Sequence, residues 1–354
     1  MRKSLIFTAA LMVFAPPAQA QERAPAISWA ITPNGSHRDG NELQLTIESR
    51  WAPGNSSMWS NTRKIEDLPG LSAAQLRGAT QPARFTLAGE AGRLDCNGTA
   101  GGLTGRGTCL LTPNAGFVSY LAARGIARPT QHDIFSLTMS GVGRGLIEAM
   151  EKLGYPRPTI DQLTRMGIHG VSPEFINGLA TSGYRLRSAN DLITFRIHGV
   201  DVDYIRGMAA AGPKLQHLAA DDLVSLRIHG VQPEYVQQLA AIGPAFAGLT
   251  AEDLVSFRIH GVNPRLVQSY VRATGGALDS GEVVSMAIHG VSPQFIDGMA
   301  ALGYRQFSAE ELVSLRIHGV TPDYVRSLQL AGMTRLTPDQ LVRLRLAGFD
   351  AAKK

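Results

Sequence analysis

The sequence has no run of apolar residues long enough to cross a bilayer, which takes about twenty. A shorter run, Leu5 to Phe14, follows Arg2 and Lys3 and spans roughly ten residues. Two prolines end it, and the pattern Ala18-Gln19-Ala20 comes next. We expect a signal peptide over residues 1–20, with an uncleaved N-terminal anchor as the alternative. The mature chain would then be periplasmic or secreted, with no membrane insertion after signal cleavage.

Motifs of common enzyme classes are also missing. The sequence contains no H-E-x-x-H zinc-protease motif, no G-x-S-x-G nucleophile motif and no Walker phosphate-binding loop. The glycines between Gly141 and Gly145 imitate a dinucleotide-binding loop, but no strand is predicted before them. We therefore expect no catalytic residue, no cofactor and no bound metal, and predict that the protein is not an enzyme.

Charge is sparse and only mildly basic. Charged residues make up 18% of the chain and hydrophobic residues 44%, which is typical of a folded protein rather than a disordered one. The formal net charge is +5, and removal of Arg2 and Lys3 with the signal would leave +3 (5 − 2). Export argues against a nucleic-acid partner, so anionic envelope components or an acidic protein face are the partners that this charge favours.

Residues 21–114 are predicted to form a small antiparallel β-domain. Leu43, Leu45 and Ile47 alternate with polar residues, which is typical of a strand with one buried face. Residues 51–77 lack this alternation, and we expect loops there, with one short helix that begins at a capping box on Ser72.

The only two cysteines, Cys96 and Cys109, lie on either side of a glycine-rich stretch within that domain. Antiparallel pairing about this stretch would place the two cysteines opposite each other, within reach of a disulfide. An oxidising compartment favours the disulfide. The alternative, a two-thiol metal or redox site, lacks the C-x-x-C spacing.

The strongest pattern in the sequence is an internal repeat of Ile-His-Gly-Val. Its glycines are 29 or 31 residues apart, and degenerate copies at Gly141 and Gly348 keep the spacing of 29. Eight copies at this spacing indicate a tandem array of short structural units. The six full copies carry Gly170, Gly199, Gly230, Gly261, Gly290 and Gly319.

Each unit reads as helix, tight turn, helix. A capping box on Ser308 opens the first helix, Gly319 suits the residue that ends it, and Pro322 suits the first turn of the second. Further capping boxes are predicted at Thr250, Thr337 and Ser188. We therefore predict a mainly α fold, with an α-solenoid of about eight two-helix repeats over residues 115–350.

A helical wheel distinguishes the two helices of a repeat. The second helix has one apolar face, which in the last full repeat comprises Tyr324, Val325, Leu328 and Ala331. The first helix has two apolar flanks, one with Leu226 and the other with Ile228. We expect a helix with two apolar flanks to lie wedged between neighbours on both sides.

Six histidines and five arginines recur at fixed positions beside the repeat glycine. A histidine in the last helical turn can donate to free carbonyls, so we interpret the histidines as structural, with a metal or acid–base role as the alternative. We interpret the arginines as a candidate partner-binding surface, with structural salt bridges to Asp203, Glu234 and Asp323 as the alternative. The histidines are His169, His198, His229, His260, His289 and His318, and the arginines are Arg196, Arg227, Arg258, Arg316 and Arg345.

The segment Leu-Val-Ser-Leu-Arg-Ile-His-Gly-Val-Thr-Pro-Asp-Tyr-Val, residues 312–325, resembles repeats attached to bacterial membrane metallopeptidases of the penicillin-sensor type. Related repeats occur in free-standing exported proteins, where a short β-region resembling residues 85–109 precedes them. The resemblance covers about residues 80–350. The chain lacks the peptidases' membrane helices and zinc-binding helix, so the resemblance implies a sensing or partner-binding role and no peptidase activity.

Together these patterns predict an exported, non-enzymatic repeat scaffold for protein–protein interaction, with an unknown protein partner in the cell envelope. It could belong to an envelope sensing or regulatory system. The alternative is an envelope-ligand or metal-binding protein that uses the arginines or the histidines.

Overall fold

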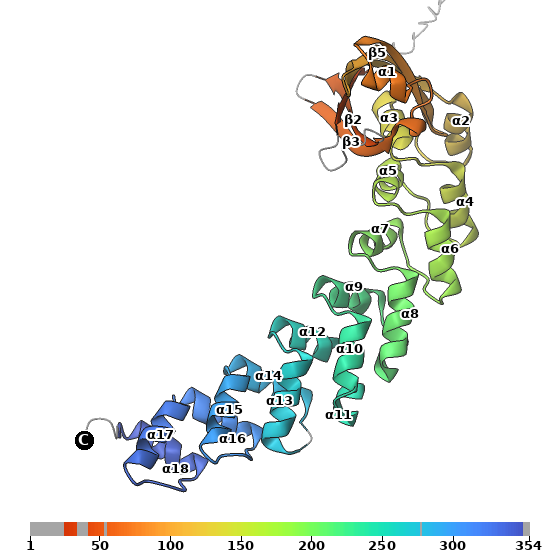
Figure 1. Ribbon diagram of the computed structural model, residues 1–354. Helices are drawn as coiled ribbons and strands as arrows, with labels where there is room; N and C mark the ends of the chain where they lie inside the picture. Colours follow the sequence, from red (N-terminus) through yellow and green to blue (C-terminus); the bar gives the residue numbers. More distant parts are fainter. Residues whose placement is uncertain (1–24, 34–41, 53–54, 277, 350–354) are drawn as a thin grey trace, which may run out of the picture. The chain divides into compact units, whose positions relative to one another are not determined.

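The structure is a computed structural model that describes residues 25–33, 42–52, 55–276 and 278–349. The predicted signal peptide, residues 1–20, lies outside the described residues. Within them, a six-stranded antiparallel sheet precedes most of 18 α-helices (Figure 1). Two compact units are formed, one by residues up to 144 with residues 158–164, and the other by residues 145–157 with the chain from residue 165 onward. No described helix has the length and apolar character that crossing a membrane would require.

The sheet has the strand order β3-β2-β1-β6-β5-β4, with every neighbouring pair antiparallel. Sequential strands pair as two meanders, and β1 joins them by pairing with β6. The strands are β1 (Ala26–Pro33), β2 (Glu42–Ala52), β3 (Asn55–Lys64), β4 (Gln81–Ala88), β5 (Gly92–Gly101) and β6 (Thr104–Pro113).

The alternation predicted for β2 is confirmed, since Leu43, Leu45 and Ile47 are all buried in the sheet core. The expectation of loops over residues 51–77 was wrong in part, because β3 pairs along β2 as an edge strand. Its sequence, Asn-Ser-Ser-Met-Trp-Ser-Asn-Thr-Arg-Lys, is mostly polar and exposed, so it lacks the apolar alternation of an internal strand. The short helix α1 (Ala73–Arg77) does begin at the Ser72 capping box.

Glycines in β5 and β6 make room for the largest side chain of the sheet core. Trp29 of β1 is 2% exposed, and its Nε1 donates to the carbonyl of Asn97 at 3.1 Å. A Cβ on Gly98, Gly105 or Gly107 would lie 2.6–2.8 Å from indole atoms, closer than van der Waals contact. The glycine-rich stretch is therefore largely paired strand, shaped to accept the indole.

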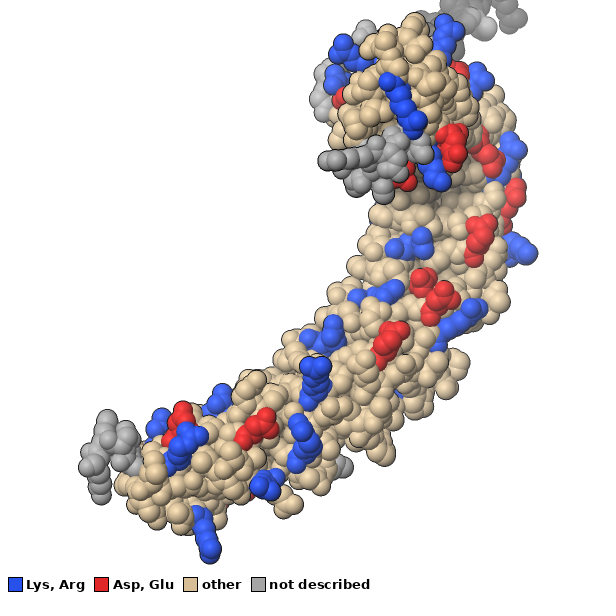
Figure 2. All heavy atoms as spheres, viewed as in Figure 1, with Lys and Arg blue, Asp and Glu red and all other residues tan. Residues whose placement is uncertain are grey.

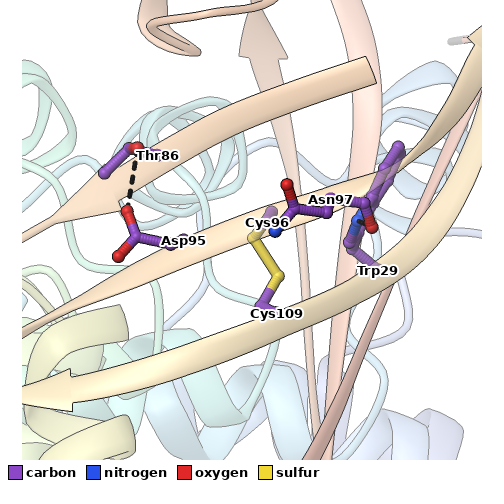
Figure 3. Close-up of a disulfide and its surroundings, with 6 residues drawn as sticks. All are labelled: Trp29, Thr86, Asp95, Cys96, Asn97 and Cys109. Atoms are coloured by element: carbon purple, nitrogen blue, oxygen red, sulfur yellow. Dashed lines mark hydrogen bonds between the residues drawn. A yellow bond between two sulfur atoms is a disulfide. The ribbon is translucent and has the colours of Figure 1, made fainter. Parts of the chain in front are cut away.

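Cys96 and Cys109 form the predicted disulfide. The residues lie directly opposite each other on β5 and β6, with their Cα atoms 4.0 Å apart (Figure 3). The strands are connected by a tight turn in which Gly102 and Leu103 both have positive φ, as a two-residue hairpin turn requires. The turn sets the strand register, and the register brings the two sulfur atoms together.

Two helices follow the sheet within the first unit. Helix α2 (Ala115–Ala123) begins at Asn114, whose side chain accepts from the backbone N–H groups of Gly116 and Phe117. Helix α3 (Gln131–Met139) contacts β2, β5 and β6, and its Phe135 is fully buried in the sheet core. The sheet thus has a helix closing one side of its core.

The repeats form pairs of short helices, most of them nine residues long. The full pairs from α3 to α17 number seven within the described chain, and α18 supplies the first helix of an eighth. The remaining first helices are α5 (Ile160–Ile168), α7 (Ala189–Ile197), α9 (Ala220–Ile228), α12 (Ala251–Ile259), α14 (Ser280–Ile288), α16 (Ala309–Ile317) and α18 (Pro338–Leu346). The second helices are α4 (Arg144–Lys152), α6 (Pro173–Thr181), α8 (Val202–Ala211), α10 (Pro233–Ala240), α13 (Pro264–Thr274), α15 (Pro293–Ala301) and α17 (Pro322–Leu330), and a short helix α11 (Pro244–Ala247) follows α10.

Like helices contact like helices in the second unit. From α9 onward each first helix contacts the first helix of the next repeat, and from α6 onward the second helices do the same. In Figure 1, α9, α12 and α14 form one row and α8, α10 and α13 a row beside it. The four predicted capping boxes, at Ser188, Thr250, Ser308 and Thr337, are all present.

Candidate partner-binding surface

Three consecutive residues precede the turn between the two helices of a repeat, as Arg227, Ile228 and His229 do at the end of α9. In α9 the helix ends at His229, and Gly230 follows with φ +68°. The N–H of Gly230 donates to the carbonyl of Arg227, and the N–H of Val231 donates to that of Leu226. This is the Schellman pattern of a helix C-terminus, which needs a left-handed residue and therefore favours glycine. All eight repeat glycines have φ between +68° and +73°.

The recurrent arginine, where it is present, clamps its repeat to the one before it. The guanidinium of Arg227 lies 4.2 Å from the centroid of the Tyr204 ring in α8, the second helix of the preceding repeat. Its Nε donates to the carbonyl of Gly199 at 2.8 Å, and its Nη1 donates to the side chain of Gln232 at 3.0 Å. A planar cation with several donors suits this combined role, because it can stack on a ring and bond a carbonyl at once.

The same clamp recurs at all five arginine positions. The other four guanidinium groups lie 4.8–5.1 Å from an aromatic centroid in the preceding second helix. Two of them, Arg196 and Arg258, also donate from Nε to the carbonyl of the preceding repeat's histidine. The pairs are Arg196 with Phe175, Arg258 with Tyr235, Arg316 with Phe295, and Arg345 with Tyr324.

Two of the three acids proposed as structural partners of these arginines have other contacts, and no ion pair with any of the five arginines is seen for the third, Glu234, among the described residues. Asp203 and Asp323 pair within their own helices, with Arg206 and Arg326 three residues later. The arginines therefore do have structural partners, but these are rings and backbone carbonyls rather than carboxylates. Sequence reasoning missed the clamp because its two halves lie more than twenty residues apart, in different repeats.

Two tyrosines of these pairs, Tyr204 and Tyr235, bind across the same junction in the opposite direction. The hydroxyl of Tyr204 donates to the carbonyl of Val231 at 2.9 Å, and that of Tyr235 to Val262 at 2.8 Å. Burial raises the pKa of each phenol to about 12, although the arginine over the ring opposes the shift. Each hydroxyl therefore stays protonated and able to donate throughout the neutral range.

The histidines lie at the helix ends, where they were predicted. In three repeats the ring Nδ1 is 2.8 Å from the carbonyl four residues earlier, as for His229 and Ser225. Because a carbonyl only accepts, Nδ1 carries the proton in this contact. Within the described part of the chain, no group of three or more His, Cys, Asp or Glu side chains is placed to hold a metal ion.

In the six full repeats the residue before the histidine is exposed, although it is isoleucine. We call these six residues the isoleucine ladder: Ile168, Ile197, Ile228, Ile259, Ile288 and Ile317, with exposed fractions of 49–59%. The degenerate last copy has Leu346 at the same position, 66% exposed. Of the ten large apolar side chains exposed among the described residues, seven occupy this one position.

The wheel prediction for the first helix was therefore wrong at one flank. Leu223 and Leu226 are fully buried as expected, but Ile228 extends into solvent beside the half-buried Val224. The second helix also differs at one residue, since Ala331 follows the end of α17 and is exposed. An isoleucine on the side of the helix opposite its buried leucines, repeated in every unit, was the available signal in the sequence.

Charges on the helical part of the chain are spread out rather than continuous. On the face drawn in Figure 2, basic side chains along the helical part are separated by uncharged atoms, with acidic side chains among them. No protein-family model matches this sequence, and no curated protein matches it.

Proposed function

We propose that this protein is an exported, non-enzymatic scaffold whose helical repeats form an α-solenoid and bind a partner polypeptide along the isoleucine ladder. The observation that carries the proposal is the concentration of exposed apolar side chains at one repeat position. Such side chains cost solvation free energy in every unit, and contiguous apolar surface marks interaction sites. The clamps support this role, because they fix the spacing of the repeats without occupying the ladder.

The spacing of the repeats favours one kind of occupant. Packed helices lie about 8–10 Å apart, so consecutive ladder side chains should recur at about that interval. A polyproline II segment presents the same face every third residue, or roughly every 9 Å. A β-strand repeats its face at about 6.7 Å and would drift out of register. We therefore commit to an extended, polyproline II-like segment with an apolar side chain at every third residue.

Export is supported by the N-terminal unit. A disulfide between Cys96 and Cys109 suits an oxidising compartment, in keeping with the signal sequence expected over residues 1–20. In this proposal the partner is a polypeptide of the cell envelope.

Selection from a random peptide library displayed on phage tests the proposal with the full chain as bait. We expect enriched peptides to share apolar residues at intervals of three. A variant with Ile228, Ile259 and Ile288 all changed to Ser should lose these peptides while keeping its melting temperature, because all three side chains are mostly exposed. The matched control is Leu330→Ser, since Leu330 is 84% exposed but lies outside the ladder. Peptides that bind the triple variant and the native chain equally tightly would contradict the proposal.

A further inference from the structure

Two junctions between repeats lack the arginine clamp, and the one between α13 and α14 carries a further inference. At the positions where the other junctions pair an aromatic ring with arginine, this junction has Leu266 in α13 and Ala287 in α14. The only other such substitution among the aligned repeats, Leu146 with Gly167, also changes both members together. The ring and the arginine are thus present together in five pairs and absent together in two.

Loss of the clamp leaves an open space at this junction. A cavity of about 430 Å³ lies between α13 and α14, with Leu266, Ala287 and Val291 among its apolar walls. At the clamped junction before it, a Cβ on Gly230 would meet Nη2 of Arg258 at 3.2 Å, whereas a Cβ on Gly261 would meet nothing within 4 Å. The volume lies within the range of small-ligand pockets, about 300–1,000 Å³.

The polar part of the cavity is suited to an anion. Its lining includes Arg265, His260 and Asn263, and none of its described lining residues is acidic. Arg265 is exposed at a position where four of the five clamped repeats carry an acid, namely Glu174, Asp203, Glu234 and Asp323. Pro264 begins α13, and Pro293, which begins α15, lines the cavity, so the positive ends of two helix dipoles lie nearby. The charge at the position of Arg265 is therefore opposite to that in the preceding repeat, whereas the following repeat has the neutral Gln294.

We propose that this junction is a binding pocket for a short branched apolar group that ends in a carboxylate. The apolar body would fill the space that an arginine stem and an aromatic ring occupy elsewhere, between Leu266 and Ala287. The carboxylate would pair with Arg265, with the Asn263 amide as a further donor. The ligand source is either a small carboxylic acid or the C-terminal leucine of a polypeptide. The pocket does not require the isoleucine ladder, so the two proposals can fail separately.

Methyl NMR spectra of the full chain test the proposal, with the methyl groups of Leu266, Ala287 and Val291 as reporters, of which Val291 is present in every variant. The first probes are isocaproate, its neutral amide isocaproamide and the cation isohexylamine. We expect saturable shifts with isocaproate and about fivefold weaker binding of the amide, as for loss of one exposed ion pair. Equal binding of acid and amide, tighter binding of the amine, or no saturable shift with any carboxylate would overturn the proposal.

Two variants locate the binding. Arg265→Gln should weaken the binding of isocaproate about fivefold. Arg272→Gln, in the same helix but outside the cavity lining, should leave this binding unchanged. The double variant Leu266→Phe with Ala287→Arg rebuilds a clamp like that of Phe295 with Arg316 and leaves the bond from the Tyr270 hydroxyl to the Val291 carbonyl in place, so it should abolish binding without lowering the melting temperature. Unchanged isocaproate binding by the folded double variant would refute the assignment of this pocket.

A pair of peptides distinguishes the two ligand sources. Acetyl-Ala-Ala-Leu with a free carboxylate is compared with the same peptide bearing a C-terminal amide. Binding of the free peptide more tightly than isocaproate supports a polypeptide C-terminus as the ligand, and equal or weaker binding supports a small acid. Loss of all preference for the free carboxylate over the amide would overturn the proposal in both forms.

Discussion

The guanidinium of Arg227 lies 4.2 Å from the centroid of the Tyr204 ring, and the two residues bond each other's repeats in opposite directions. Arg227 donates to the carbonyl of Gly199 in the preceding repeat, and Tyr204 donates to the carbonyl of Val231 in the following one. A single pair of side chains thus satisfies polar groups at two successive turns while packing between them.

Arg227→Ala should lower the free energy of unfolding by about 1–2 kcal/mol, the sum expected for one cation–π contact and one hydrogen bond to a carbonyl. Urea denaturation monitored by circular dichroism measures the change. The matched control is Arg206→Ala, which removes an exposed arginine whose ion pair with Asp203 has a 4.0 Å separation. That control should stay within about 0.5 kcal/mol of the native chain. Equal effects of both substitutions would show that the clamp contributes nothing specific.

Alkaline stability should depend on the buried phenols. The pKa of Tyr204 is raised to about 12 in the folded chain, whereas in the unfolded chain it is about 10. The unfolded state therefore loses its proton first, and the stabilising contribution is complete below pH 10 and declines as the pH rises toward 12. Tyr204→Phe should lower the free energy of unfolding by about 1 kcal/mol at neutral pH, and it should make the decline of this free energy above pH 10 less steep. Melting temperatures measured across this range check both effects, and parallel curves for the two proteins would contradict them.

Gly230→Val should destabilise the chain by roughly 1–3 kcal/mol, because a β-branched residue is strained at φ +68°. The added side chain would also meet Arg258, 3.2 Å from the Cβ position. Gly248→Ala is the control, since that glycine has negative φ and open space around its Cβ position. Thermal unfolding compares them. A Gly230→Val protein as stable as the control would rule out the conformational requirement.

Replacement of both Cys96 and Cys109 by Ala should lower the free energy of unfolding of the sheet domain by about 3 kcal/mol, the chain-entropy value for a loop of about fifteen residues. Guanidinium unfolding with and without reductant measures this loss. Reductant should destabilise the native chain but leave the variant unchanged. Free thiols that titrate in the folded, exported protein would disprove the bridge.

Local features of the fold could be predicted from the sequence because their causes are local. A capping box such as that of Ser308 lies within four residues, and the turn at Gly319 depends on its own φ. The disulfide followed from the symmetry of one hairpin. Strand β3 was missed because an exposed edge strand needs few apolar residues. Its sequence therefore lacks the apolar alternation that would have predicted its pairing with β2.

Contacts between repeats were harder to predict. The wheel placed Arg227 between two apolar flanks, but it carried no information about Tyr204 in the preceding unit. Joint substitution of the pair, as in Leu266 with Ala287, was the signal that connects them. Exposure of Ile228 likewise depends on what the next repeat covers, which a single-helix pattern does not contain.

The most direct test of the central claim is the affinity of one library-selected peptide for three proteins, measured by fluorescence anisotropy. These are the native chain, the variant with Ile228, Ile259 and Ile288 changed to Ser, and the Leu330→Ser control. Loss of apolar contacts at three ladder positions predicts a Kd at least about tenfold higher for the triple variant, since each contact contributes on the order of 0.5–1 kcal/mol. The control should bind like the native chain, and all three proteins should melt alike. Equal affinity for all three would contradict the claim that the ladder binds the partner.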